Sequence, residues 1–228
     1  MILRLYGGAQ LILQESTIYP FIEKRPASYE VITVKKNACI VRANEESKYI
    51  WYLLEGEVKV VAVSNNGKSI VVDEIAPNNF VGHLSNLFGQ NFYCDSFAVT
   101  DCTLVQIPIA RFLELMQQLA FSRLFYLKVN NRLYTMYKKE LVKHLFSQQE
   151  QLAYYLLQNA KGNECQIKSM YKTSEYLCIS RRNLYNMIDS FVLDGCLSKT
   201  EEGDILIADF EKLQEKAQPV ATYLNNLI

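Results

Sequence analysis

Polar residues that can hydrogen-bond to base edges recur at helical spacing near the C-terminal end of the sequence. Arg182, Tyr185 and Asn186 share one side of a helix, and Arg181 and Asn183 flank its start. Guanidinium, amide and phenol groups contact base edges in a major groove. The spacing indicates a DNA-reading helix face, although an amphipathic helix pair in an all-α domain would give the same pattern.

Capping residues delimit two short helices around this face. Ser169 is a good N-cap for a helix running to about Leu177, Ser180 caps the second helix, and Gly195 stops it. The side of the second helix opposite the polar face is apolar and suited to packing: Leu184, Met187, Ile188 and Phe191. Residues 197–209 then indicate two strands around a Glu-Gly-Asp turn. Two helices and a hairpin predict a winged helix-turn-helix.

These residues carry a family resemblance. The run 175–188, followed by Phe191 and residues 194–197, resembles the DNA-binding end of the Crp/Fnr regulators (catabolite activator and fumarate–nitrate type). In that family a serine opens the recognition helix and an arginine usually follows, as Ser180 and Arg181 do here. The resemblance implies that two such helices of a homodimer read a palindromic operator.

Three positions shape what the resemblance implies. The next recognition positions are Arg182 and Asn186, where many members carry Glu and Arg, so the base preference should differ from the best-known site. Cys178 stands where the family turn usually has Gly, which tolerates a left-handed backbone that Cys disfavours.

The middle of the chain is rich in Val, Ile and aromatic residues and reads as β structure. The predicted strands cover 31–34, 39–42, 49–54, 58–63, 69–75 and 97–107. Asn66-Gly67 is the clearest hairpin signal, and many short strands predict a sandwich or barrel. Residues 52–60 and 76–82 resemble the glycine-containing strand pair and the cassette lead-in of the family's sensor β-roll.

The cassette departs from the pattern of cyclic-nucleotide-binding members. Gly82 is kept, but His83 replaces the ribose-binding Glu, and Phe92 and Tyr93 stand where an Arg and a hydroxyl residue belong. The sequence has no Arg between Arg42 and Arg111. A buried cyclic phosphate without a fixed cation would lose its charge-assisted bonds, so we expect an effector other than cyclic AMP or cyclic GMP.

An effector pocket is expected around the cassette, from Gly82, His83, Leu84, Phe92 and Tyr93. Three interpretations of His83 stay open: an axial haem ligand, as in one gas-sensing relative, an effector contact, or a hydrogen-bonded structural histidine. A lone His is weak support for a metal site. No metal and no cofactor is predicted, and the effector is unknown.

A long helix is predicted over residues 122–146, after a first helix that opens at Pro108. Tyr126, Val129, Leu133 and Met136 recur at coiled-coil spacing, and in the family this helix forms the dimer interface. A stripe facing the core of a single chain is the alternative.

The predicted fold class is α+β: an N-terminal double-stranded β-helix of jelly-roll type, a long dimerisation helix and a winged helix-turn-helix. The expected divisions are an N-terminal segment (1–28), a cyclic-nucleotide-binding-like β-roll (29–117), the long helix (118–146) and the DNA-binding domain (147–228). Ser147 and Glu150 form a capping box at the last boundary. Within the last division, a loop is expected at 160–164, and a last helix capped by Asp209 is predicted from Phe210 to about Gln218, ended by Pro219.

Charge and cysteine content limit the function classes. The chain of 228 residues carries 24 basic and 24 acidic residues, and residues 147–228 hold 8 against 11, which counts against DNA binding. Basic residues nevertheless cluster near the reading helix, and phosphate contacts are assigned to Ser169, Lys172, Ser180 and Lys199. The six cysteines include no CxxC pair, so neither a zinc nor an iron–sulfur site is indicated.

The leading hypothesis is a cytoplasmic, non-enzymatic transcription regulator. Its expected partners are duplex DNA and a second copy of itself, with RNA polymerase and a small-molecule effector as further expected partners and no membrane. Two alternatives stay open. One is a cupin-like β-roll enzyme, which has only His83 and His144 as candidate metal ligands. The other is an effector-binding module that acts through protein contacts without DNA.

Overall fold

The computed structural model describes residues 7–45, 47–67, 69–83, 94–165, 167, 169–201 and 204–225. Backbone contacts divide the chain into two compact units, Met1–Tyr134 and Thr135–Ile228, and the division falls inside the long helix α5 (Leu119–Leu145). Each unit has its own hydrophobic core. The prediction of an α+β fold with a β-roll, a long helix and a winged helix-turn-helix is confirmed.

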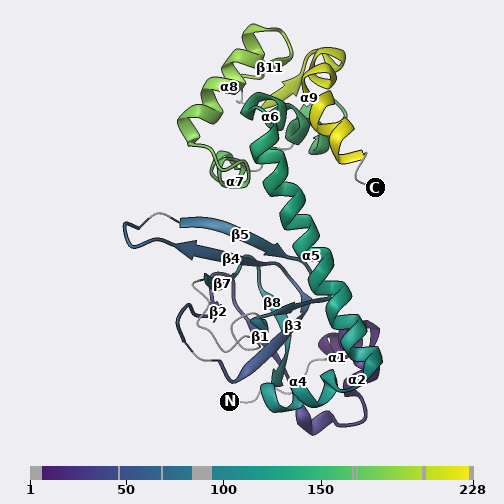
Figure 1. Cartoon of the computed structure of the whole chain (residues 1–228). Coiled ribbons are helices and arrows are strands. Elements are labelled where there is room, and N and C mark those ends of the chain that lie inside the picture. Colours follow the sequence, from purple (N-terminus) through teal and green to yellow (C-terminus); the bar gives the residue numbers. More distant parts are fainter. Residues whose placement is uncertain are drawn as a thin grey trace. The chain divides into compact units, whose positions relative to one another are not determined.

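Two four-stranded antiparallel sheets form the β-roll of the first unit (Figure 1). One sheet has the order β1-β8-β3-β6 and the other β2-β7-β4-β5. The strands are β1 (Glu30–Val34), β2 (Cys39–Val41), β3 (Tyr49–Glu55), β4 (Val58–Val63), β5 (Ser69–Ile75), β6 (Asn79–Val81), β7 (Cys94–Ala98) and β8 (Cys102–Pro108). The predicted bounds of β4 and β5 are confirmed, with Gly67 at φ +79° in the turn between them.

The prediction of one strand over residues 97–107 is wrong, because a tight turn separates β7 from β8. Asp101 fixes this turn by accepting a hydrogen bond from the Lys36 backbone N–H at 2.9 Å and an ion pair from Lys35 at 2.7 Å. Gly56 packs so closely on it that an added Cβ would lie 2.5 Å from the Asp101 carbonyl oxygen. Strand β6 was not predicted, since its three residues follow a Pro-Asn turn signal.

Helices close one side of the roll. Helices α1 (Gly7–Glu15), α2 (Tyr19–Ile22), α4 (Ile109–Met116) and the start of α5 share a core with strand β3, and a 3₁₀ turn spans Pro26–Ser28. Phe80 of β6 lies at the centre of an aromatic group, with ring centroids 4.9–6.0 Å from its neighbours: Tyr52, Phe112, Phe121 and Phe125. This group anchors α4 and the first turns of α5 to the sheet.

The second unit is a winged helix-turn-helix. It contains α6 (Gln148–Gln158), α7 (Met170–Tyr176) and α8 (Arg181–Leu193), followed by β11 (Leu197–Lys199), β12 (Ile205–Ile207) and α9 (Phe210–Asn225). Both parts of the predicted capping box are present, because Ser147 Oγ accepts from the Glu150 backbone and the Glu150 carboxylate accepts from the Ser147 backbone.

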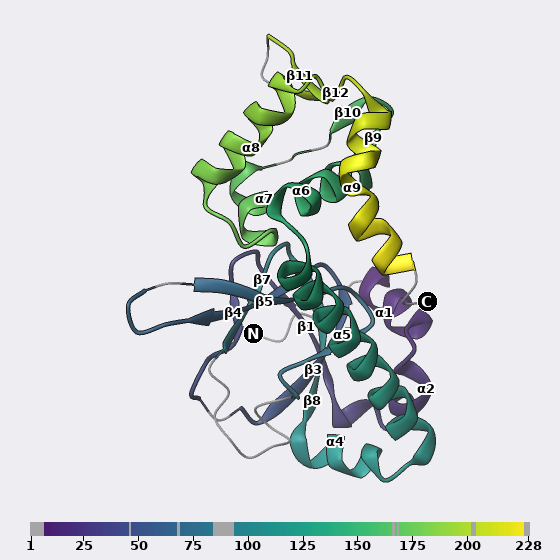
Figure 2. The same ribbon diagram turned by 45° about the horizontal axis from the view of Figure 1, so that its top comes forward.

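Two features of this unit differ from the sequence prediction. The expected loop at 160–164 contains the short strands β9 (Ala160–Lys161) and β10 (Glu164–Cys165), which extend the wing to a sheet of order β11-β12-β10-β9 (Figure 2). The prediction that Pro219 ends the last helix is wrong. Helix α9 continues through Pro219, and Val220 just beyond it is fully buried.

Candidate nucleic-acid interface and sensor site

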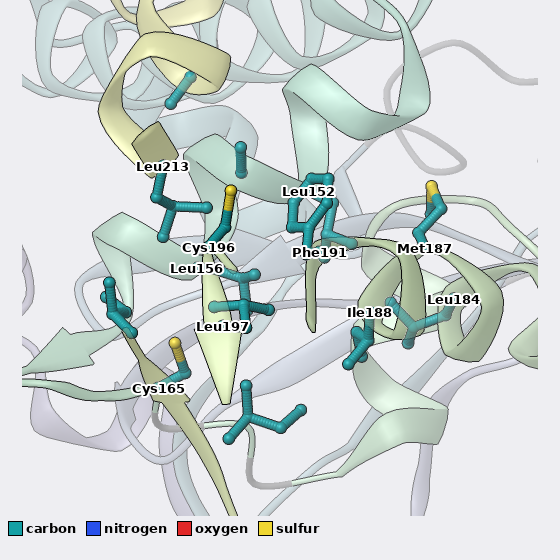
Figure 3. Close-up of a cluster of buried hydrophobic side chains, with 14 of the residues drawn as sticks. Leu152, Leu156, Cys165, Leu184, Met187, Ile188, Phe191, Cys196, Leu197 and Leu213 are labelled. Atoms are coloured by element: carbon teal, nitrogen blue, oxygen red, sulfur yellow. The ribbon is translucent and has the colours of Figure 1, made fainter. Parts of the chain in front are cut away.

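Helix α8 is fixed at its start by a cap and along one side by the core. Ser180 Oγ accepts a hydrogen bond from the Asn183 backbone N–H at 3.1 Å. The predicted apolar side is buried, with Leu184, Ile188 and Phe191 fully inaccessible and Met187 6 % exposed (Figure 3). A helix held in this way presents its other side in a defined orientation.

The side of α8 that faces solvent carries the predicted reading residues. Arg181, Arg182, Tyr185 and Asn186 are all exposed, and Tyr185 retains 47 % of its accessible surface. Within the described residues, the side chains of Arg182 and Asn186 make no hydrogen bond or ion pair. The pKa of the Tyr171 phenol is raised, chiefly by a hydrogen bond with Glu175, while the nearby Arg181 charge acts in the opposite direction.

Asn183 differs from the other predicted reading residues. Its side chain is half-buried, and its amide Nδ2 donates to Oε1 of Gln148 on α6. This amide is therefore engaged by another side chain of the protein. The two residues are 35 positions apart, and the sequence did not predict their contact.

The residues expected to contact phosphates surround α8. Ser169 caps α7 by accepting from the Lys172 backbone N–H at 3.4 Å, and the Lys172 side chain is exposed. Lys199 on β11 forms an ion pair with Asp189 on α8 at 2.5 Å, so its charge is partly neutralised. The pair links the wing to the exposed side of the helix.

The turn between α7 and α8 has the left-handed geometry typical of the motif. Cys178 has φ +52°, a conformation that costs about 1–2 kcal/mol for a residue with a Cβ. The thiol is exposed. The turn geometry is thus formed despite the absence of glycine.

Of the expected effector pocket, the described residues include Gly82 and His83, whereas Leu84, Phe92 and Tyr93 lie outside them. Gly82 has φ +80°, and an added Cβ would lie 3.0–3.1 Å from the Trp51 ring and from Val41. Only glycine fits this position without displacement of the core.

His83 is buried and uncharged. It is 6 % exposed, and its ring stacks edge-on against Phe125 of α5 at 5.6 Å. Burial, with a smaller contribution from the Arg132 charge, lowers its pKa from 6.5 to about 4. Its Nδ1 has no hydrogen-bond partner among the described residues.

Arg132 on α5 is a cation close to His83, and the sequence alone did not predict it because it lies far along the chain from the cassette. Its guanidinium pairs with Asp73 of β5 through Nε at 3.1 Å and through Nη2, and Nη1 donates to the Phe80 carbonyl at 2.6 Å. The two charged side chains are 17 % and 11 % exposed. The charge of Arg132 is therefore balanced within the protein.

Helix α5 carries an apolar stripe on its exposed side. Tyr126 and Leu133 of the predicted seam are 56 % and 60 % exposed, while Val129 packs partly against the core of the first unit and Met136 is half-buried. Three further residues are 47–61 % exposed at matching helical spacing: Leu127, Tyr134 and Tyr137.

Two kinds of site are not found in the described ranges. No group of three or more His, Cys, Asp or Glu side chains there could hold a metal ion. Among the same residues, no helix has the length and apolar character needed to cross a membrane.

Comparisons with known proteins agree with this architecture. Residues 31–119 match the cyclic nucleotide-binding domain family. The chain is 22 % identical over 168 residues to the regulatory protein YeiL of Escherichia coli O157:H7, covering 73 % of this chain and 76 % of that protein.

Solved structures show the same fold over most of the chain. A CooA variant from Carboxydothermus hydrogenoformans superposes with a TM-score of 0.67 and 18 % identity, over 94 % of this chain and 98 % of the other. TTHA1359, a CRP/FNR-family transcriptional regulator from Thermus thermophilus, gives a TM-score of 0.63 and 18 % identity, over 83 % and 98 %. Residues 31–119 thus resemble the cyclic nucleotide-binding domain, and the chain has the fold of the Crp/Fnr transcription regulators.

Proposed function

We propose that this chain is a homodimeric transcription regulator of Crp/Fnr type that binds a palindromic DNA operator through α8. The observation that carries the proposal is the exposed side of that helix. Arg182 and Asn186 are held by a capped, well-packed helix and have no hydrogen-bond or ion-pair partner in the described part of the chain. Arginine is suited to guanine edges and asparagine to adenine edges.

A selection experiment tests DNA recognition. The full chain is used to enrich duplexes from a randomised library, and binding to the enriched duplex and to a random duplex is measured by gel shift across salt concentrations. Arg181→Ala should weaken binding to the enriched duplex by about 1–3 kcal/mol, with a smaller effect on the random duplex.

A matched control separates base reading from loss of charge. Lys212→Ala removes one exposed cation from α9 and should weaken both duplexes equally and slightly. Unchanged discrimination in Arg181→Ala would count against the assignment. If the unmodified chain shows no salt-dependent binding to duplex DNA, a module that acts through protein contacts is favoured instead. The excess of acidic over basic residues in 147–228 is the observation that supports this alternative.

Dimerisation is assigned to the exposed stripe of α5. Two helices related by two-fold symmetry would pair along Tyr126, Leu133 and Tyr137, and would set two α8 helices about 34 Å apart for successive major grooves. Leu133→Glu should convert a dimer to a monomer in sedimentation experiments. Thr135→Glu, at an exposed position of the same helix opposite Tyr126, Leu133 and Tyr137, is the control and should leave the dimer intact.

The effector is expected to be a molecule other than cyclic AMP or cyclic GMP. The sequence has no Arg between Arg42 and Arg111, and the Arg132 guanidinium is already paired with Asp73. A cyclic phosphate would therefore meet no unbalanced cation from these residues. Saturable thermal stabilisation of the chain by cyclic AMP would refute this expectation.

A further inference from the structure

The first turn of α6 contacts both the end of α5 and the start of α8. Gln151 is 7 % exposed, and its Nε2 donates to the Phe146 carbonyl at 2.8 Å and, more weakly, to the Lys143 carbonyl at 3.5 Å. The last carbonyls of a helix have no partner inside that helix, so this side chain caps α5. The position of the α6 turn is thereby fixed to the end of α5.

The same turn holds the start of α8 through Gln148. Gln148 Oε1 accepts from the Asn183 side chain, while the Asn183 backbone N–H donates to the Ser180 cap. The neighbouring capping box between Ser147 and Glu150 holds the backbone on which Gln148 stands. Residue 183 is therefore restrained at both its backbone and its side chain, in the helical turn that begins with Arg181.

Resting on the proposed DNA-binding function, we propose that Gln148 is a positioning residue that sets the direction of the first turn of α8. On this proposal Asn183 holds the helix and does not read bases. Bidentate contacts from Arg181 and Arg182 require a defined approach to the base edge, so a small rotation of their helical turn would weaken them. Through Gln151 and Gln148, the start of α8 is tied by side-chain hydrogen bonds to the end of α5.

Contacts from α5 to the α7–α8 turn support a linked arrangement. The Lys139 ammonium lies 5.0 Å from the centre of the Tyr176 ring. Burial disfavours the charged form of Lys143, but the nearby side chains of Cys178 and Glu140 outweigh it, so the pKa of Lys143 is raised. The last two turns of α5 thus contact the reading motif at its turn, in addition to the link through α6.

The test compares Gln148→Ala, Asn183→Ala, the double variant and the exchanged pair Gln148→Asn with Asn183→Gln. Gln149→Ala is the control, because Gln149 is exposed on the same turn and its side chain makes no hydrogen bond to the described residues of α8. Each single variant should bind the duplex enriched by the unmodified chain about fivefold more weakly, and a random duplex within about twofold. The double variant should be no weaker than either single one, and the exchanged pair should recover binding to within about twofold.

Three results would overturn the proposal. The first is a loss of binding of about 25-fold in the double variant, which is the product of the two single losses and would mean that the residues act independently. The second is failure of the exchanged pair to recover, and the third is a changed base preference in Asn183→Ala that Gln148→Ala does not share.

If the unmodified chain enriches no duplex, the proposed DNA-binding function is wrong, but the hydrogen bond between Gln148 and Asn183 can still be tested. NMR of the Asn183 side-chain amide then decides about the link. Its protons should exchange with solvent more slowly in the unmodified chain than in Gln148→Ala, and equal rates would contradict the proposal.

Discussion

The buried His83 should make the β-roll less stable as the pH falls from 7.5 to 5. Replacing His83 with Gln should remove this part of the pH dependence. The pKa of this imidazole is lowered from 6.5 to about 4, mainly because burial disfavours the charged ring and also because the Arg132 guanidinium is close. The unfolded chain therefore binds a proton at this site at a higher pH than the folded chain. Its contribution to stability is complete above pH 6.5 and is lost as the pH falls toward 4.

The size of the effect follows from these two values. At about 1.4 kcal/mol per pKa unit, the full difference corresponds to about 3 kcal/mol. Between pH 7.5 and pH 5, where most carboxylates are still ionised, linkage gives a loss of about 2 kcal/mol from this residue. In His83→Gln, which cannot take up a proton, that part of the loss should disappear.

Trp51 provides the assay, because it is the single tryptophan of the chain and lies in β3 with its ring against Gly82. Urea unfolding of both proteins followed by its fluorescence at pH 7.5 and pH 5 gives four free energies of unfolding. The unmodified chain should lose about 2 kcal/mol more than His83→Gln over this interval. Equal losses would show that His83 is not buried in its neutral form, and His83→Phe repeats the comparison if the Gln variant does not fold.

Two further substitutions test local geometry. Cys178→Gly should raise the free energy of unfolding of the second unit by about 0.5–1 kcal/mol, because glycine adopts the left-handed conformation without strain. A urea titration followed by circular dichroism measures this free energy, and a decrease would contradict the prediction. Arg132→Met should destabilise the roll by about 3 kcal/mol by leaving Asp73 buried and unpaired. Adding Asp73→Leu should recover most of that loss in the Trp51 assay, and no recovery would argue against a buried pair.

The sequence correctly predicted the elements whose bounds depend on nearby residues. The bounds of β4 and β5 follow from Asn66-Gly67 between two apolar runs, and α8 follows from Ser180 and the apolar side of the helix. Strands of two or three residues, such as β9 and β10, are too short to show alternation and were missed.

Tertiary packing decided the features that local signals could not. Pro219 is a strong stop signal, yet α9 continues because Val220 beyond it is buried. In the candidate sites, the exposed residues of α8 were predictable from helical spacing. The Arg132–Asp73 pair and the Asn183–Gln148 bond join residues 59 and 35 positions apart, and a single sequence gives no indication of such pairings. The predicted roles of the individual side chains in DNA and effector binding stay predictions.

The two units hold separate hydrophobic cores: two buried clusters, around Phe80 and around Leu104, lie in the roll, and one around Leu184 and Phe191 lies in the winged domain. Heating should therefore produce two calorimetric transitions rather than one, and a single melting temperature would not describe the whole chain. A molecule that binds only one folded unit raises the transition of that unit alone. A calorimetric scan can thus assign any candidate ligand to the roll or to the winged domain before its binding residues are known.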